Sequence, residues 1–361
     1  MELDHTKTAS PTPLRWPDIF RTVRAVEWWE YKLSPTLAIA YATAFLSRIP
    51  ISSLWPQLLV MLFALATCAA YASVINDLTD FNDDQASGKV NHLVGKSRSF
   101  IIAALTACLL LGIAAAVYWR GEALLVSLYL GAWISFTLYS LPPFRLKTRG
   151  VLGLLACASG EHLFPSLLAV TMVSRRVGAF DTIWFTSVAT WSLSYGLRSI
   201  LWHQLNDLPN DEKTDLGTFA RRHKTTWVHR FGNFIIFPTE AAAFCVMLWR
   251  AGSRLAVALL CFYALFEALR KRLWGVNLVV VVPKARYHIL MQEYYQLFFP
   301  LALLLSSSSR YLLDTLLIAT HLFLFPRRAL QALKDLKVFV YALKVIMTRM
   351  RGRRLSAPKK L

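Results

Sequence analysis

Residues 54–84 read LWPQLLVMLFALATCAAYASVINDLTDFNDD, an apolar run that ends in a cluster of acidic side chains. A helix of about 20 apolar residues crosses the hydrocarbon core of a bilayer, which is about 30 Å thick. In lipid the backbone must satisfy its own hydrogen bonds, and this run lacks the two-residue alternation of a barrel strand. The stretch therefore predicts a membrane-spanning helix that carries carboxylates to one membrane surface.

The composition of the whole chain indicates an integral membrane protein. Of the 361 residues, 56% are hydrophobic and 17% are charged, and the mean hydropathy is +0.43. Soluble proteins average about 25% charged residues. This composition excludes a disordered or collagen-like chain. The five cysteines all lie in apolar runs without CxxC spacing, which indicates packing residues rather than a metal or redox site.

Similar apolar runs recur along the chain. They cover residues 34–49, 54–75, 99–118, 122–141, 151–173, 182–205, 231–249, 253–269, 294–308 and 311–326. The last two are short and form either one broken span or two. We therefore expect an all-α fold, a polytopic membrane helical bundle of nine to ten transmembrane helices. A cytoplasmic N-terminal segment (1–33) precedes the transmembrane domain (34–326), and a cytoplasmic tail (327–361) follows it.

The basic residues predict the orientation of the chain. A net charge of +19 would indicate nucleic acid in a soluble protein, but here the basic residues lie between apolar runs, so no nucleic-acid partner is expected. With a cytoplasmic N-terminus and ten spans, thirty-two of the forty Lys and Arg fall in the cytoplasm, seven outside and Arg198 within a span. This excess follows the positive-inside rule. Without a visible transit peptide, we expect a multi-pass protein of a bacterial plasma membrane.

The tail after Pro326 carries eleven of these basic residues. Its apolar residues, from Leu330 to Met347, follow helical spacing, and most of its basic residues lie on the other side. This pattern is typical of a basic amphipathic helix on anionic lipid. A solvated tail that only enforces topology is the alternative.

Two acidic segments follow the second and the sixth span, both on the cytoplasmic side. If each helix continues, residues four apart stack on one face, where like charges repel unless a cation lies between them. Mg²⁺ binds one or two carboxylates and keeps waters and substrate phosphate oxygens, so two facing ladders predict a diphosphate clamped by Mg²⁺. Neither segment offers the Cys/His cluster of a soft-metal site. The ladder residues are Asn76, Asp80 and Asp84 in the first segment, and Asp207, Asp211 and Asp215 in the second.

A third motif lies between the two ladders, where residues 139–150 read YSLPPFRLKTRG. The two prolines end the fourth span and stiffen its exit. Arg145 and Lys147 then lie near the same membrane surface, where cations can hold diphosphate oxygens.

The three motifs resemble, in order and spacing, those of the UbiA superfamily of intramembrane prenyltransferases, over about residues 20–310. The matching features are Asn76/Asp80/Asp84, the 139–150 stretch, and Asp207/Asp211 followed by Gly217-Thr218. The resemblance implies a helical bundle, typically of nine spans, around a central cavity that opens to the membrane. It also implies that the aspartates hold two Mg²⁺ ions and an isoprenyl diphosphate. Ionisation of that substrate gives an allylic carbocation, which alkylates an acceptor, often an aromatic ring.

The resemblance assigns roles to individual residues. Asp80, Asp84, Asp207 and Asp211 are the expected catalytic residues, and all six ladder residues are expected metal ligands. Family members commonly carry Asn-Arg-Pro after the first ladder, where this chain has Asn91-His92-Leu93. Either the site lacks that cation, or His92, Lys89 or Lys96 replaces it. The expected diphosphate-binding residues are Lys89, His92, Tyr139, Arg145, Lys147 and Lys213.

Polar side chains inside spans are costly and often functional. The candidates are Glu161, His162, Arg198, His203 and Gln204. They are expected to recognise an acceptor or to act as a general base. The alternative is hydrogen bonding within the bundle, which is favoured for Arg198.

Three functions remain open. The leading one is a Mg²⁺-dependent prenyltransferase that moves an isoprenyl group from an isoprenyl diphosphate to an aromatic acceptor, with its site facing the cytoplasm. A terpene cyclase would share the fold and the ionisation step but use no acceptor. A transporter would use the acidic loops as an entry filter, but transporter sites lie near the membrane midplane, and both ladders lie at one surface.

Overall fold

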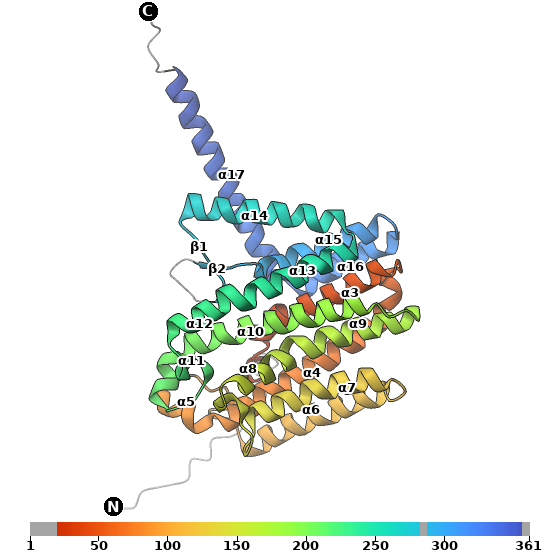
Figure 1. The fold of residues 1–361 in the computed structure, drawn as a ribbon, viewed down its shortest axis with the longest axis vertical. Helices are drawn as coiled ribbons and strands as arrows, with labels where there is room; N and C mark the ends of the chain where they lie inside the picture. The colour runs from red at the N-terminus through yellow and green to blue at the C-terminus, as the bar shows by residue number, and fades with distance from the viewer. Residues whose placement is uncertain (1–19, 282–286, 356–361) are drawn as a thin grey trace, which may run out of the picture.

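The computed structural model describes residues 20–281 and 287–355, and most of them lie in long helices packed side by side (Figure 1). Within these residues, strands occur only as β1 (Asn277–Val279) and β2 (Tyr287–Ile289), which pair in parallel. The fold is all-α, as predicted. In chain order the helices are α2 (Ala25–Trp28), α3 (Ser34–Leu46), α4 (Trp55–Thr79), α5 (Phe81–Ser87), α6 (Arg98–Tyr118), α7 (Ala123–Ser140), α8 (Val151–Ala158), α9 (Phe164–Val177), α10 (Thr182–Lys213), α11 (Phe219–Arg222), α12 (Thr225–Phe231), α13 (Phe237–Ala251), α14 (Arg254–Trp274), α15 (Phe299–Ser308), α16 (Thr315–Leu324) and α17 (Pro326–Leu355).

Several of these helices suit a membrane. Among the described residues, five helical segments are long and apolar enough to cross one, namely Ile51–Thr79, Arg98–Tyr118, Ala123–Ser140, Val151–Val177 and Thr225–Ala251. The outer helix α6 also leaves large apolar side chains uncovered, such as Ile102 and Leu110, which are 64% and 63% exposed. A continuous exposed apolar surface on a helix is explained by contact with lipid.

Among the described helices, four directly follow a π-helical turn and carry a proline as their second residue. Proline has no N–H to donate to the carbonyl four residues earlier, and its ring clashes with that carbonyl. A wide π turn accommodates both problems inside an otherwise continuous helix. The π turns are Trp29–Leu33 before Pro35, Ser159–Leu163 before Pro165, Gly232–Ile236 before Pro238, and Tyr294–Phe298 before Pro300.

The long helix α10 packs against α8 and α13 and carries the second acidic segment. A Cβ atom at Gly196 of α10 would lie 2.9 Å from Ala158, the last residue of α8, so only glycine permits this approach. The π turn after α8 is thereby held beside α10. This contact brings Glu161, in that turn, close to the end of α10 that holds the aspartates.

The last helix, α17, projects away from the bundle (Figure 1). The Glu30 carboxylate accepts the backbone N–H groups of Arg327 and Arg328 at 2.9 and 3.1 Å, which satisfies free donors at the start of the helix. Further along, Asp335 accepts a hydrogen bond of 2.5 Å from the buried Arg270 of α14. Residues 1–19 and 356–361 of the expected terminal segments lie outside the described residues.

Candidate active site

A cavity of about 240 Å³ lies where the acidic ends of α4 and α10 approach the end of α7. Asn76 and Asp80 line it from α4 and the residue that follows α4, and Asp207 and Asp211 line it from α10. The structure thus brings four of the six ladder residues to one cavity, which we call the aspartate cavity. Its apolar wall includes Leu65, Cys68, Ala69, Ala132 and Phe136.

The first ladder keeps helical spacing although α4 ends at Thr79. The Asp80 N–H donates to the carbonyl of Asn76 at 3.0 Å, and the Asp84 N–H donates to the carbonyl of Asp80 at 2.8 Å. Asp84 is nevertheless buried and does not line the cavity. Its Oδ2 accepts a hydrogen bond of 2.8 Å from the side-chain amide of Asn91. The Asn91 amide therefore holds the third member of this ladder away from the cavity.

The second ladder has two members rather than three. Helix α10 continues through Pro209 and ends at Lys213, so Asp207 and Asp211 share one helical face. Asp215 lies beyond that end with a φ of 54°, and its side chain is 91% exposed and paired with Arg221. The expected stacking of Asp215 on the ladder is therefore wrong, because spacing of four residues aligns side chains only while the helix continues.

Basic side chains already pair with the ladder aspartates. The ammonium group of Lys147 pairs with Asp80 and lies 3.3 Å from the amide oxygen of Asn76. The guanidinium of Arg145 donates to Asp80 at 3.0 Å and to Asp83 at 2.7 Å. Arg145 has a φ of 37°, in the left-handed region that a side chain such as arginine rarely adopts.

On the opposite wall, Lys89 donates a hydrogen bond of 2.7 Å to Asp207. Tyr139 also lines the cavity, whereas the exposed Lys213 donates to the Ser87 carbonyl and does not line it. His92 lies 3.1 Å from buried Asp77 and is likewise absent from the lining. Of the three candidates to replace the family arginine, Lys89 is therefore the one in the cavity.

Burial changes the acid–base properties of the site. Lys147 is 3% exposed, and desolvation lowers the pKa of its ammonium group although Asp80 opposes this shift. Asp211 lies beyond the expected span 182–205. Desolvation raises the pKa of its carboxyl to about 6, although the hydrogen bond that Thr218 donates to it opposes this shift. Both shifts reflect the cost of placing a charge in a poorly solvated site.

The oxygen donors of the aspartate cavity fit a magnesium ion. Asn76, Asp80, Asp207 and Asp211 are hard ligands of the kind that Mg²⁺ prefers. The ammonium groups of Lys147 and Lys89 pair with Asp80 and Asp207, which shows that both sides of the cavity accept a cation. Asp211, by contrast, belongs to none of the ion pairs among the described residues.

The polar residues predicted within spans fall into two groups. Glu161, His203 and Gln204 line the aspartate cavity. Arg198 instead makes a buried bidentate pair with Glu240, with both hydrogen bonds at 2.7 Å, which is the structural alternative favoured for this residue. His162 is buried against Tyr195, with ring centroids 4.6 Å apart.

Two cationic residues of the site were not predicted as such. Lys32 lines the cavity and pairs with Glu161, and Arg24 lines it and pairs with buried Asp77 at 3.1 Å. In the sequence both looked like topology signals at the cytoplasmic end of the first span. Acidic residues in distant segments indicated that these cations could form ion pairs. The sequence does not say, however, which segments become neighbours.

The fold and this cavity define a membrane-embedded helical protein with an acidic, cation-binding site at one end of the bundle. Residues 33–279 match the model of the UbiA prenyltransferase family. The chain belongs to the UbiA prenyltransferase family, which confirms the resemblance and establishes an integral membrane protein. A search of curated proteins gave no match.

Solved structures with a similar fold come from the same family. One is a UbiA homolog from Archaeoglobus fulgidus bound to GPP and Mg²⁺, with 15% identity, a TM-score of 0.51, and coverage of 86% of this chain and 99% of that one. Another is a UbiA homolog from Archaeoglobus fulgidus bound to DMAPP and Mg²⁺, with the same identity and TM-score and coverage of 81% and 99%. At this identity the similarity establishes the fold.

Proposed function

We propose that this protein is a Mg²⁺-dependent membrane prenyltransferase that moves an isoprenyl group from an isoprenyl diphosphate to an aromatic acceptor. The observation that carries the proposal is that carboxylates from two distant segments face one cavity whose other wall is apolar. The GPP and DMAPP bound with Mg²⁺ in the similar structures support this class of substrate. Asp80, Asp84, Asp207 and Asp211 are the proposed catalytic carboxylates, with Asp84 acting from its buried position beside Asn91.

In the proposed reaction, the bond between the isoprenyl C1 and the diphosphate oxygen breaks, and its electron pair leaves with the diphosphate. When bound by Asn76 and the aspartates, Mg²⁺ would supply positive charge that stabilises this leaving group. Lys147 and Lys89 pair with Asp80 and Asp207 in the structure. In the proposed complex these ammonium groups bind diphosphate oxygens instead. The apolar wall around Phe136 receives the isoprenoid chain and excludes water from the carbocation.

The acceptor ring then attacks the carbocation, a carbon–carbon bond forms, and the ring loses a proton. Glu161 is the proposed proton acceptor, because it lines the cavity and its Oε2 has no hydrogen-bond partner among the described residues. Lys32 holds the other oxygen of that carboxylate in place. His203 lines the same wall and is proposed to contact the acceptor.

We also propose the topology that the sequence predicts. Helices lie at all ten expected apolar runs, in keeping with nine to ten spans. From the distribution of the basic residues, both termini and the site are proposed to face the cytoplasm of a bacterial plasma membrane. The tail from residue 327 is proposed to lie on anionic lipid. Leu330, Leu333 and Val340 of α17 are 54%, 54% and 43% exposed, and apolar side chains at such spacing form a lipid-facing stripe.

A terpene cyclase is the second candidate, since it would need the same ionisation site. The polar groups of Glu161, His203 and Gln204 favour the transferase, because a cyclase gains from an apolar cavity that does not quench the cation. Mass spectrometry tests the choice: purified protein is incubated with Mg²⁺ and a panel of isoprenyl diphosphates, with and without aromatic acceptors. A cyclic product formed at a rate that acceptors do not change would contradict the transferase proposal.

A further inference from the structure

A second cavity, of about 540 Å³, adjoins the aspartate cavity. Glu27, Lys32 and His203 line both cavities, so the two cavities meet at these side chains. The second cavity is also lined by α10, by β2 with the residues that follow it, and by Arg328 of α17. The isoprenyl diphosphate, held at the aspartates, does not account for it.

Most charges around this second cavity are already neutralised by a partner. Four of them form ion pairs: Lys32 with Glu161, Glu27 with Arg24, Arg198 with Glu240, and Glu293 with Arg270. Where no metal ion replaces one member of the pair, a charge that is held by a close partner contributes little further attraction for a ligand, because both members keep their hydrogen bonds.

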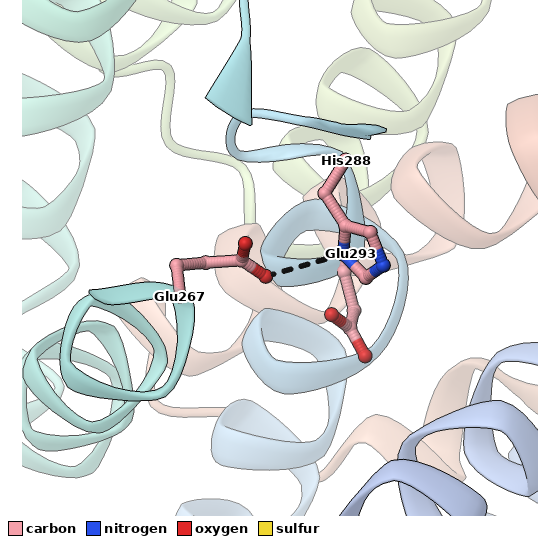
Figure 2. A group of neighbouring side chains, drawn as sticks. All are labelled: Glu267, His288 and Glu293. Atoms are coloured by element: carbon pink, nitrogen blue, oxygen red, sulfur yellow. Dashed lines mark ion pairs between the residues drawn. The ribbon is translucent and has the colours of Figure 1, made fainter. Parts of the chain in front are cut away.

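The pair at Glu293 belongs to a larger group. Figure 2 shows Glu267, His288 and Glu293 pointing toward one another, and their potential ligand atoms lie within 4.8 Å of each other. Arg270 donates hydrogen bonds of 2.5 Å to both glutamates and lies 3.3 Å from His288 Nδ1. Because the guanidinium supplies the positive charge that these carboxylates need, we interpret the group as an ion-pair network rather than a metal site.

Arg328 is the exception among the charges of this cavity. Its Nε donates to the amide oxygen of Gln296 at 2.8 Å, and its guanidinium lies 4.9 Å from the centre of the Tyr31 ring. Within residues 20–281 and 287–355, no ion pair of its side chain with a carboxylate is found. Its remaining N–H groups form the planar fork that binds carboxylate or phosphate oxygens.

Aromatic side chains complete the wall near this guanidinium. Tyr31, Tyr195 and Trp202 line the second cavity. The indole nitrogen of Trp202 is buried and has no hydrogen-bond partner among the described residues. Such a wall suits a flat aromatic molecule, because aromatic rings pack against each other and a buried N–H group gains from an acceptor atom of the ligand.

We propose that the second cavity is the acceptor site and that Arg328 holds an anionic group, a carboxylate or a phosphate, on the aromatic acceptor. This inference rests on the proposed transferase function. The acceptor ring would then reach past Lys32 and His203 into the aspartate cavity, toward Glu161 and the C1 end of the isoprenyl diphosphate. Arg328 lies outside the family match, which ends at residue 279.

The test is equilibrium binding of three probes to the purified full-length protein in detergent: 2-naphthoate, 2-naphthyl phosphate and the uncharged 2-naphthamide. We expect at least one anionic probe to bind about tenfold more tightly than the amide, as a charge-assisted hydrogen bond predicts. Arg328→Gln should remove this preference and Arg328→Lys should keep part of it. Arg327→Gln is the matched control, because Arg327 is exposed and does not line the cavity.

Equal binding of all three probes by the unchanged protein, or an unaltered preference in Arg328→Gln, would overturn the proposal. So would displacement of the bound naphthyl probe by GPP, because the two ligands are proposed to occupy different cavities. Release of diphosphate from GPP with Mg²⁺ and aromatic acceptors is measured on the same preparation. Its absence would contradict the transferase function, whereas the loss of preference in Arg328→Gln reports on the second cavity independently.

Discussion

Replacing Asp211 by Asn removes one negative charge from the aspartate cavity and preserves the local shape. The Asp211 side chain is buried, and its Oδ2 accepts a hydrogen bond of 2.8 Å from Thr218. The amide oxygen of an asparagine can accept the same bond. The variant is therefore expected to fold like the original protein and to lose only the carboxylate charge.

The size of the effect follows from the pairing around the cavity. Asp207, on the same helical face, is already paired with Lys89 at 2.7 Å, and Asp80 is paired with Lys147. Asp211 forms no ion pair with another described residue, so it is the carboxylate most available to a metal. Loss of one preorganised electrostatic partner lowers a rate by about 10²–10³, which corresponds to about 2.7–4 kcal/mol. We expect Asp211→Asn to slow diphosphate release by this factor.

The assay measures release of diphosphate from GPP by purified protein at saturating Mg²⁺ with aromatic acceptors present. Glu212→Gln is the matched control, because Glu212 is the next residue of α10 but is exposed and lies outside the cavity lining. The control should stay within about threefold of the original rate. A rate for Asp211→Asn in that same range, or an equal loss in both variants, would refute the argument that ladder position rather than bulk negative charge matters.

Three further outcomes are expected. Lys147→Gln should raise the KM for isoprenyl diphosphate by about tenfold in steady-state assays, while Arg149→Gln, which lies outside the cavity lining, should not; equal KM values would contradict the proposed diphosphate contact. Glu240→Gln should lower the free energy of unfolding by about 3–5 kcal/mol in thermal or denaturant unfolding, because Arg198 keeps a buried charge without its partner; an unchanged stability would contradict this. A single cysteine placed in the tail beyond Arg327 should react with an impermeant thiol reagent only from the cytoplasmic side, and labelling from outside would overturn the ten-span topology.

The ladders show how far spacing alone can predict a site. Residues four apart were expected on one face, and Asp207 and Asp211 do share a face because α10 continues through Pro209. The spacing could not predict that the helix ends two residues before Asp215. It also could not predict that Asn91 would bind the carboxylate of Asp84 and hold it outside the cavity. Side-chain competition of this kind depends on contacts that a periodic pattern does not contain.

The ion pairs across the bundle were beyond prediction for a different reason. Lys32 and Glu161 pair although they are separated by 129 positions in the chain. The positive-inside rule explained the position of Lys32 at the start of a span, so its charge suggested no further role. An apolar pattern identifies each helix, but it does not say which helices pack against each other. The identity of the partner therefore required the fold.

The prolines of the spans offer a signal that connects the sequence to these polar contacts. Lys32, Glu161 and Gln296 each lie three or four residues before a span proline and inside the π turn that precedes it. A proline leaves the carbonyl four residues earlier without its helical donor, and in a membrane another donor must replace it. For Gln296 that donor is the Ser34 hydroxyl, at 2.7 Å.

The backbone of such a π turn already needs polar partners. Burying a polar side chain there therefore costs less free energy than burying it elsewhere in a span. Its extra residue also turns the following side chains to a new direction, and π turns in other helices often lie at functional sites. Two of the three polar residues, Lys32 and Glu161, line the aspartate cavity, and the third, Gln296, orients Arg328. A polar residue three or four positions before a proline in an apolar run therefore predicts a cavity-facing side chain in this fold. The π turn before Pro238 has no such polar residue: Phe234 occupies that position and is 75% exposed.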